Sequence, residues 1–154
     1  MALIETAEVM QSWPQPGTGN EGPLLRYGRG PAILAYDTPD ERVAVVTIPG
    51  CLQVVCGHPN DEALTGHPLY GKGLAFYSVH KVQNSSRLAA MANANAVHHP
   101  HDRATYLKNK EHWVFTFQDG TVEILVLSSE AGAMSYRLCG SWSEARQFIA
   151  ASEP

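Results

Sequence analysis

The residues most suited to chemistry lie in one short segment, NANAVHHPHD, at positions 93–102. His98 and His101 are three positions apart, and two imidazoles at that spacing can bind one divalent metal ion. A carboxylate such as Glu123 or Asp119 would supply a third ligand. One interpretation of the sequence is therefore a metal set of His98, His101 and Glu123, with a divalent ion as cofactor.

The same segment allows two interpretations without a metal. Histidine gains and loses protons near neutral pH, so His98 and His101 are also candidate acid–base residues. The third interpretation is a solvated polar loop, in which Asp102 is the N-cap of a short helix over 102–109. The sequence alone leaves these three interpretations open.

Nucleophilic catalysis is disfavoured by the local sequence. Neither Ser85 nor Ser86 lies in the GxSxG pattern that presents a nucleophilic serine. Cys51 and Cys56 occupy an apolar segment, and apolar surroundings disfavour the reactive thiolate. With three cysteines in the chain, we expect free and mostly buried thiols rather than disulfides.

The bulk properties exclude several classes of protein. The 154 residues are sufficient for a single domain, 1–154. The net charge of −4, without a run of Lys or Arg, argues against a nucleic-acid partner. No segment approaches the roughly 20 apolar residues that span a bilayer, and the N-terminus lacks the features of a signal peptide. We therefore expect a cytoplasmic protein without a membrane partner.

Short apolar runs predict a sheet of antiparallel strands. Strand character is present in 24–28, 32–37, 42–48, 51–57 and 74–82, without helix-length crossovers between the first four. The clearest element is a hairpin over 111–127, where alternating residues flank Asp119-Gly120. Trp113, Phe115 and Phe117 share one face of that hairpin, and Glu123 lies on the opposite face of its own strand from Ile124.

Two helices and one long irregular segment complete the predicted architecture. A helix over 84–97 begins at a capping residue among Asn84, Ser85 and Ser86, and 141–151 reads as a C-terminal helix. Residues 57–73 are rich in glycine and proline and read as a long loop. The fold class is α+β: an antiparallel, strongly bent sheet of about six or seven strands with two or three helices.

The stretch from His67 to Glu123 resembles a set of small conserved bacterial proteins of unassigned function. Their pattern runs His-Pro-Leu, Gly-Leu, Asn-Ser and Val-His before a hairpin with Thr-Phe-His-Asp-x-Thr-x-Glu. The chain departs at Gln118, where the pattern has His, and at His99-Pro100, where the proline is shifted. The resemblance covers about a third of the chain and brings no known activity, but it implies that these segments belong to one site. The matching positions are His67, Pro68, Leu69, Gly73, Leu74, Asn84, Ser85, Val97, His98, His101, Thr116, Phe117, Asp119, Thr121 and Glu123.

Two functions from different classes follow. The first is a small-molecule pocket, metal-assisted or based on histidine acid–base chemistry, and it predicts that the candidate side chains converge. The second is a protein-binding accessory or immunity-like module, which predicts dispersed histidines and outward-facing Leu69 and Tyr70. The pocket is favoured, and the oligomeric state is open, a homo-oligomer included. The catalytic candidates are His98, His101, Asp119 and Glu123, and the ligand-binding candidates are His67, Tyr70, Asn84 and Ser85.

Overall fold

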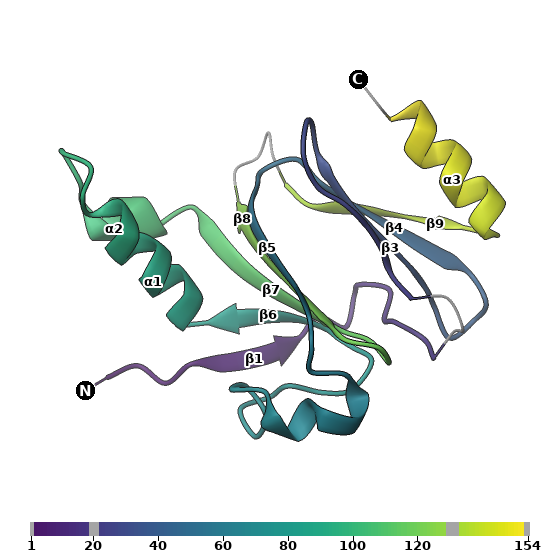
Figure 1. The fold of residues 1–154 in the computed structure, drawn as a ribbon, viewed down its shortest axis with the longest axis horizontal. Helices are drawn as coiled ribbons and strands as arrows, with labels where there is room; N and C mark the ends of the chain where they lie inside the picture. The colour runs from purple at the N-terminus through teal and green to yellow at the C-terminus, as the bar shows by residue number, and fades with distance from the viewer. Residues whose placement is uncertain (1, 19–21, 129–132, 153–154) are drawn as a thin grey trace.

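The computed structural model describes residues 2–18, 22–128 and 133–152. Its strands form two antiparallel sheets, one with the order β1-β6-β7-β8-β5 and the other with the order β2-β3-β4-β9. Figure 1 shows the two sheets facing each other, with α1 and α2 at one end of the molecule and α3 at the other. The five-stranded sheet comprises β1 (Thr6–Val9), β5 (Cys51–Gly57), β6 (Val79–Gln83), β7 (Lys110–Thr116) and β8 (Thr121–Leu127). The four-stranded sheet comprises β2 (Leu24–Arg26), β3 (Ala32–Asp37), β4 (Val43–Ile48) and β9 (Ser135–Cys139).

The α+β class is confirmed, but the single bent sheet of six or seven strands is wrong. The chain leaves one sheet at Ile48 and enters the other at Cys51 through a two-residue turn. Gly50 permits this turn, because a Cβ atom there would lie 2.8 Å from the Leu127 Cβ. Two short strands joined in this way stack as separate sheets and bury their apolar faces against each other.

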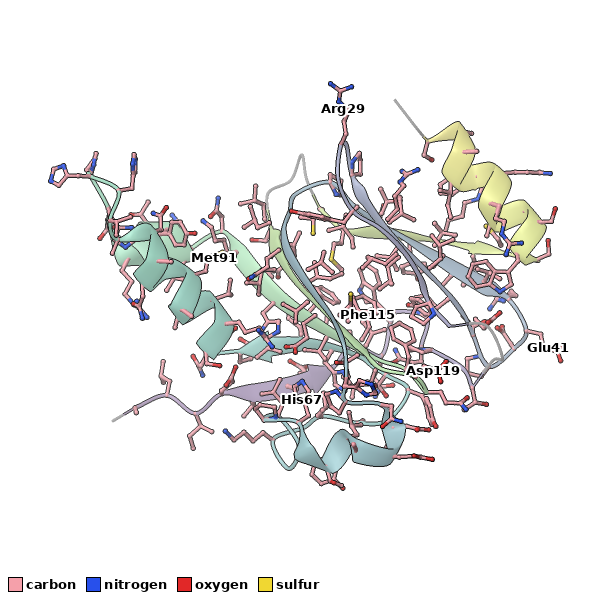
Figure 2. The ribbon with its side chains drawn as sticks, viewed as in Figure 1. Arg29, Glu41, His67, Met91, Phe115 and Asp119 are labelled. Carbon is pink, nitrogen blue, oxygen red and sulfur yellow. The ribbon has the colours of Figure 1, made fainter. Side chains whose placement is uncertain are left out.

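The main core lies between the two sheets. The β7–β8 hairpin contributes to it through side chains that alternate strictly between the inner and outer faces of the sheet. Trp113, Phe115 and Phe117 of the first strand and its turn face the four-stranded sheet, and all three are buried. Phe115 and Phe117 contact Tyr36 of β3, whose ring centroid lies 6.0 Å from that of Phe115 and 5.4 Å from that of Phe117. Phe115 is labelled in this interior in Figure 2. The predicted division of the hairpin into an apolar and an opposite face is therefore confirmed.

Helices cover the outer face of each sheet. α3 (Trp142–Ala151) packs Ala145 and Ile149 against the four-stranded sheet. α1 (Ser86–Asn95) and α2 (Arg103–Leu107) lie beside the five-stranded sheet, and α1 buries Leu88 and Ala92. The helices predicted over 84–97, 102–109 and 141–151 are thus present in slightly shorter form.

The long segment between β5 and β6 packs against the outer face of β1, β6 and β7. It contains the 3-10 helix η1 (Asp61–Gly66) and buries Leu64, Leu69 and Leu74 against Val114. This segment is therefore ordered by a small apolar core of its own.

Several local expectations fail at the sheet edges. The expectation of mostly buried thiols holds for Cys139, but β5 is an edge strand, on which Cys56 is exposed and Cys51 is only partly buried. β9 and η1 were not predicted, because neither has a regular apolar pattern that outweighs its polar residues. None of the helices in the described residues has the length and hydrophobicity needed to span a bilayer.

Candidate functional site

A single carboxylate organises the polar cluster on the outer face of the five-stranded sheet. Glu123 is 5% exposed and points away from the main core because its neighbours Val122 and Ile124 face inward. Three side chains donate hydrogen bonds to its two oxygens: His67, Arg87 and His112. A buried carboxylate is stable only with such compensation.

His112 connects Glu123 to a serine. Its Nε2 lies 2.8 Å from Glu123 Oε1, and its Nδ1 lies 2.7 Å from Ser85 Oγ. A carboxylate can only accept, so Nε2 carries the proton toward Glu123, and in the neutral ring Nδ1 accepts from the Ser85 hydroxyl. The result is a continuous chain of hydrogen bonds, Ser85 to His112 to Glu123.

Ser85 is placed by the junction between β6 and α1. It is the N-cap of α1, and its Oγ accepts from the backbone N–H of Leu88 at 3.1 Å. The preceding Asn84 has φ of 55°, a left-handed conformation that turns the chain sharply from strand to helix. Both the capping N–H and the positive end of the helix dipole favour negative charge on Ser85 Oγ.

His67 holds the other oxygen of Glu123 from the long segment. Its Nε2 lies 3.3 Å from Glu123 Oε2, while its Nδ1 accepts from the Leu69 backbone N–H at 3.0 Å. The same turn buries Leu69 beneath the segment, and Figure 2 shows His67 beside η1. Packing of the long segment and orientation of His67 are therefore linked.

Arg87 is the charged partner of Glu123. It lies one residue into α1, and its Nε and Nη2 donate to Oε1 and Oε2 at 3.0 and 3.2 Å. Its side chain is 42% exposed while that of Glu123 is 6% exposed, so this ion pair extends from the buried cluster to the surface.

The surroundings keep Glu123 ionised. Burial by itself would raise the pKa of Glu123, but the hydrogen bonds from His112, His67 and Arg87, and the charge of Arg87, together hold that pKa far below its usual value. Glu123 is thus a fixed negative charge that orients two imidazoles and does not exchange protons near neutral pH.

The hydrogen bonds leave one group that can react. Both nitrogens of His67 are engaged, by Glu123 and by Leu69 N–H. Both nitrogens of His112 are also engaged, and one of them contacts a hydroxyl. A proton can therefore leave this cluster through Ser85 Oγ, and His112 is positioned to receive it.

Two pockets flank the cluster. One, of about 290 Å³, is lined by His67, Arg87, His112 and Glu123. The other, of about 570 Å³, lies between α1, α2 and the strands β6 and β7, and it is lined by Ser85. The hydroxyl end of the hydrogen-bond chain belongs to the larger pocket, and the carboxylate end belongs to the smaller one.

The histidine-rich segment lies elsewhere. His98 and His99 are exposed in the connection between α1 and α2, and His101 contacts Asn95 and the Tyr106 ring. In Figure 1 this connection projects at the far end of the α1–α2 pair. The histidine-rich connection is therefore a solvated turn, and it ends at Asp102, which is the N-cap of α2.

The predicted metal set is not assembled. Within the described residues, no group of three or more His, Cys, Asp or Glu side chains is arranged to hold a metal ion. Both oxygens of Glu123 are already bonded to His67, Arg87 and His112. His98 and His101 have no hydrogen bond with Glu123, because they belong to a loop beyond the end of α1.

The other candidate residues are spread around the fold. Asp119 is exposed in the β7–β8 turn, as Figure 2 shows at the end of the hairpin. Tyr70 is 43% exposed. Asn84 lines the larger pocket with Ser85 and donates to the Ile4 carbonyl. Leu69 is 2% exposed, so the prediction that it faces outward is wrong.

Two residues of the cluster were missed by the sequence analysis. His112 alternates with Trp113 and so lies on the same sheet face as Glu123; the hairpin pairs Val114 with Glu123, which makes His112 a diagonal neighbour. Alternation and a two-residue turn could therefore have identified it. Arg87 gives no such signal, because its contact depends on how α1 packs on the sheet.

No known family model, no curated protein and no solved structure matches this chain. The resemblance to small bacterial proteins therefore stays a prediction, and the functional argument depends on the geometry of the site.

Proposed function

We propose that this protein is a small-molecule hydrolase of carboxylic esters, with Ser85 as nucleophile and His112 as general base. The observation that carries the proposal is the hydrogen-bond chain from Ser85 Oγ through His112 to Glu123, with links of 2.7 and 2.8 Å. A hydroxyl, an imidazole and a carboxylate linked in this order are the set that carries out acyl transfer by serine on several unrelated folds.

The reaction would proceed in two balanced halves. Ser85 Oγ attacks the ester carbonyl carbon while its proton moves to His112 Nδ1, and the tetrahedral intermediate expels the alcohol, which takes that proton. Water then attacks the acyl-Ser85 ester, again giving a proton to His112. Collapse releases the carboxylic acid and restores the Ser85 hydroxyl as the proton returns to Ser85 Oγ.

Glu123 would act as a positioning residue. Its charge holds the His112 proton on Nε2 and stabilises the imidazolium that forms during each half-reaction. Arg87 and His67 keep Glu123 ionised and in place. The two ring nitrogens exchange the roles they have in the familiar serine hydrolase arrangement, in which the serine contacts Nε2.

Of the two kinds of chemistry predicted for a small-molecule pocket, the proposal uses histidine acid–base chemistry and not a metal ion. It assigns the general base to His112 and not to His98 or His101. It also differs from the sequence-based expectation against a nucleophilic serine. Ser85 lacks the GxSxG pattern, but it also lies between a strand, β6, and a helix, α1, directly after the left-handed Asn84. The strand–turn–helix geometry supports the proposal without the glycine pattern.

Hydrolysis of short-chain p-nitrophenyl esters tests the proposal. Ser85→Gly removes the hydroxyl but keeps a residue that caps helices almost as well, so we expect folding to persist and turnover to fall by about 10³-fold or more. Ser86→Ala, one position away on an exposed side chain, is the matched control and should retain wild-type turnover. A folded wild-type protein without esterase activity, or a fully active Ser85→Gly variant, would refute the proposal.

A further inference from the structure

The pocket that contains Ser85 has a charge opposite to that of the whole chain. The protein carries a net charge of −4. The pocket is lined by four cationic side chains and one acidic side chain, which gives its lining a net charge of +3. The charged residues of this lining are Lys81, Arg103, Lys108, Lys110 and Glu111.

The charged residues are not all neutralised within the protein. Lys81 forms an ion pair with Glu111, and Lys110 donates to the carbonyl of Tyr106. Arg103 donates to the neutral Asn93 side chain at 2.7 Å. The Lys108 side chain is exposed, and its ammonium group has no hydrogen-bond or ion-pair partner among the described residues. The positive charge of Arg103, Lys108 and Lys110 is therefore not balanced by acidic partners and remains for a ligand.

Apolar side chains from several elements also line the pocket, beside the polar Gln83, Asn84, Ser85 and Ser128. Val82 comes from β6, Leu88 and Ala89 from α1, and Leu107 from α2. A pocket of about 570 Å³ with a partly apolar lining and excess positive charge fits a small molecule that has both a hydrocarbon portion and an anionic group. The cations would also raise the local concentration of such a molecule.

We infer that the substrate of Ser85 is an ester whose acyl portion carries an anionic group, a carboxylate or a phosphate, held by the cations of the α2 side of the pocket. The inference rests on the proposed function, because it places the acyl carbonyl at Ser85. It adds a specificity that the hydrogen-bond chain of Ser85, His112 and Glu123 does not by itself provide.

The test compares two esters of nearly equal size, the mono-p-nitrophenyl ester of glutaric acid and p-nitrophenyl pentanoate, after subtraction of spontaneous hydrolysis. We expect kcat/KM to be about tenfold higher for the anionic ester at low salt, and the difference to shrink as salt screens the pocket. Lys108→Gln should reduce kcat/KM for the anionic ester at least threefold and reduce kcat/KM for the neutral ester by a smaller factor, so that the preference between the two esters falls. Lys72→Gln makes the same charge change at an exposed residue of the long segment and should preserve the difference.

A binding measurement separates the inference from the proposed function. Calorimetric titration of wild-type protein with the stable anilides of the two acyl groups reports binding whether or not esters are cleaved. Ester hydrolysis with no preference for the anionic ester, together with equal binding of both anilides, would overturn the inference and leave the proposed function intact. Preferential binding of the glutaric anilide without ester hydrolysis would overturn the proposed function and keep the pocket's anion selectivity. Failure of both measurements would overturn both.

Discussion

Five of the seven histidines of this protein lie in two contrasting regions. His98, His99 and His101 are adjacent in the sequence, yet they lie in a turn where the first two are exposed. His67 and His112 are far apart in the sequence, yet both are buried and donate to the same carboxylate. Histidines that are neighbours in the sequence thus do not form a site in this fold. The site is formed by distant histidines, which sheet register and the packing of the long segment bring to the same carboxylate.

The two regions also differ in how their side chains are constrained. Each hydrogen-bonding atom of His67 and His112 has a partner, and burial makes each of those bonds costly to lose. In the exposed turn, the interactions that involve His101 are a 3.0 Å contact with Asn95 and a ring contact with Tyr106. Substitutions should therefore have large effects in one region and small effects in the other.

The largest loss of stability is expected for Glu123→Ala. This change leaves His67, Arg87 and His112 without their shared acceptor inside the fold, and removing one partner of a buried ionic cluster costs about 3–5 kcal/mol. Chemical denaturation at neutral pH measures the free energy of unfolding. Esterase activity should also fall sharply, because His112 loses the group that orients it. A variant as stable as the wild type would show that the cluster is not coupled to the fold.

Acidification should weaken the same cluster. The folded pKa of Glu123 lies far below its usual value, whereas the unfolded chain has a pKa of about 4.3 for glutamate. The stabilising contribution is therefore fully present above that unfolded value and is lost as the pH falls toward the folded pKa. At pH 3 the loss from this residue should be about 2 kcal/mol. The free energy of unfolding should fall less between pH 7 and pH 3 in Glu123→Gln than in the wild type. An equal fall in the two proteins would contradict the account.

Arg87→Ala should have an intermediate effect. The variant loses two hydrogen bonds to Glu123 but leaves those from His67 and His112, and the Arg87 side chain is 42% exposed, so solvent screens much of its charge. We expect a loss of about 1 kcal/mol in the free energy of unfolding. Thermal unfolding of Arg87→Ala should be compared with that of Arg103→Ala. Arg103 is the matched control because it is an exposed arginine whose hydrogen bond is to a neutral side chain. A loss as large as that of Glu123→Ala would mean that Arg87 alone holds the cluster.

The smallest effect is expected in the exposed turn. The triple change His98→Ala, His99→Ala and His101→Ala should alter the free energy of unfolding by no more than about 0.5 kcal/mol and leave esterase activity unchanged. Elemental analysis of the untagged wild type beside this variant should show no stoichiometric metal that the variant lacks. A lost metal ion, or a large loss of activity, would restore the histidine-rich segment as the functional site.

Part of this site could be predicted because it depends on local rules. Alternation in the hairpin places Glu123 opposite the main core, and a capping serine between β6 and α1 is expected before a helix. His67 and Ser85 were ligand-binding candidates on the basis of a resemblance, but spacing gave neither of them a place in the hydrogen-bond cluster around Glu123. The contact of Arg87 with Glu123, and the approach of the long segment that brings His67, depend on packing between elements distant in the sequence. Periodicity carries no information about such contacts.

The most direct test of the central claim is covalent labelling of Ser85 with a fluorophosphonate. The serine oxygen displaces fluoride from phosphorus, and its proton passes to His112, so the rate reports activation of the hydroxyl. Intact mass and peptide mapping of the folded protein should show one adduct per chain at Ser85. The adduct should be absent in Ser85→Gly, unchanged in Ser86→Ala and much slower to form in folded His112→Gln. No adduct at Ser85, or the same labelling rate without His112, would contradict the account and leave Ser85 as a helix cap that ties α1 to the sheet.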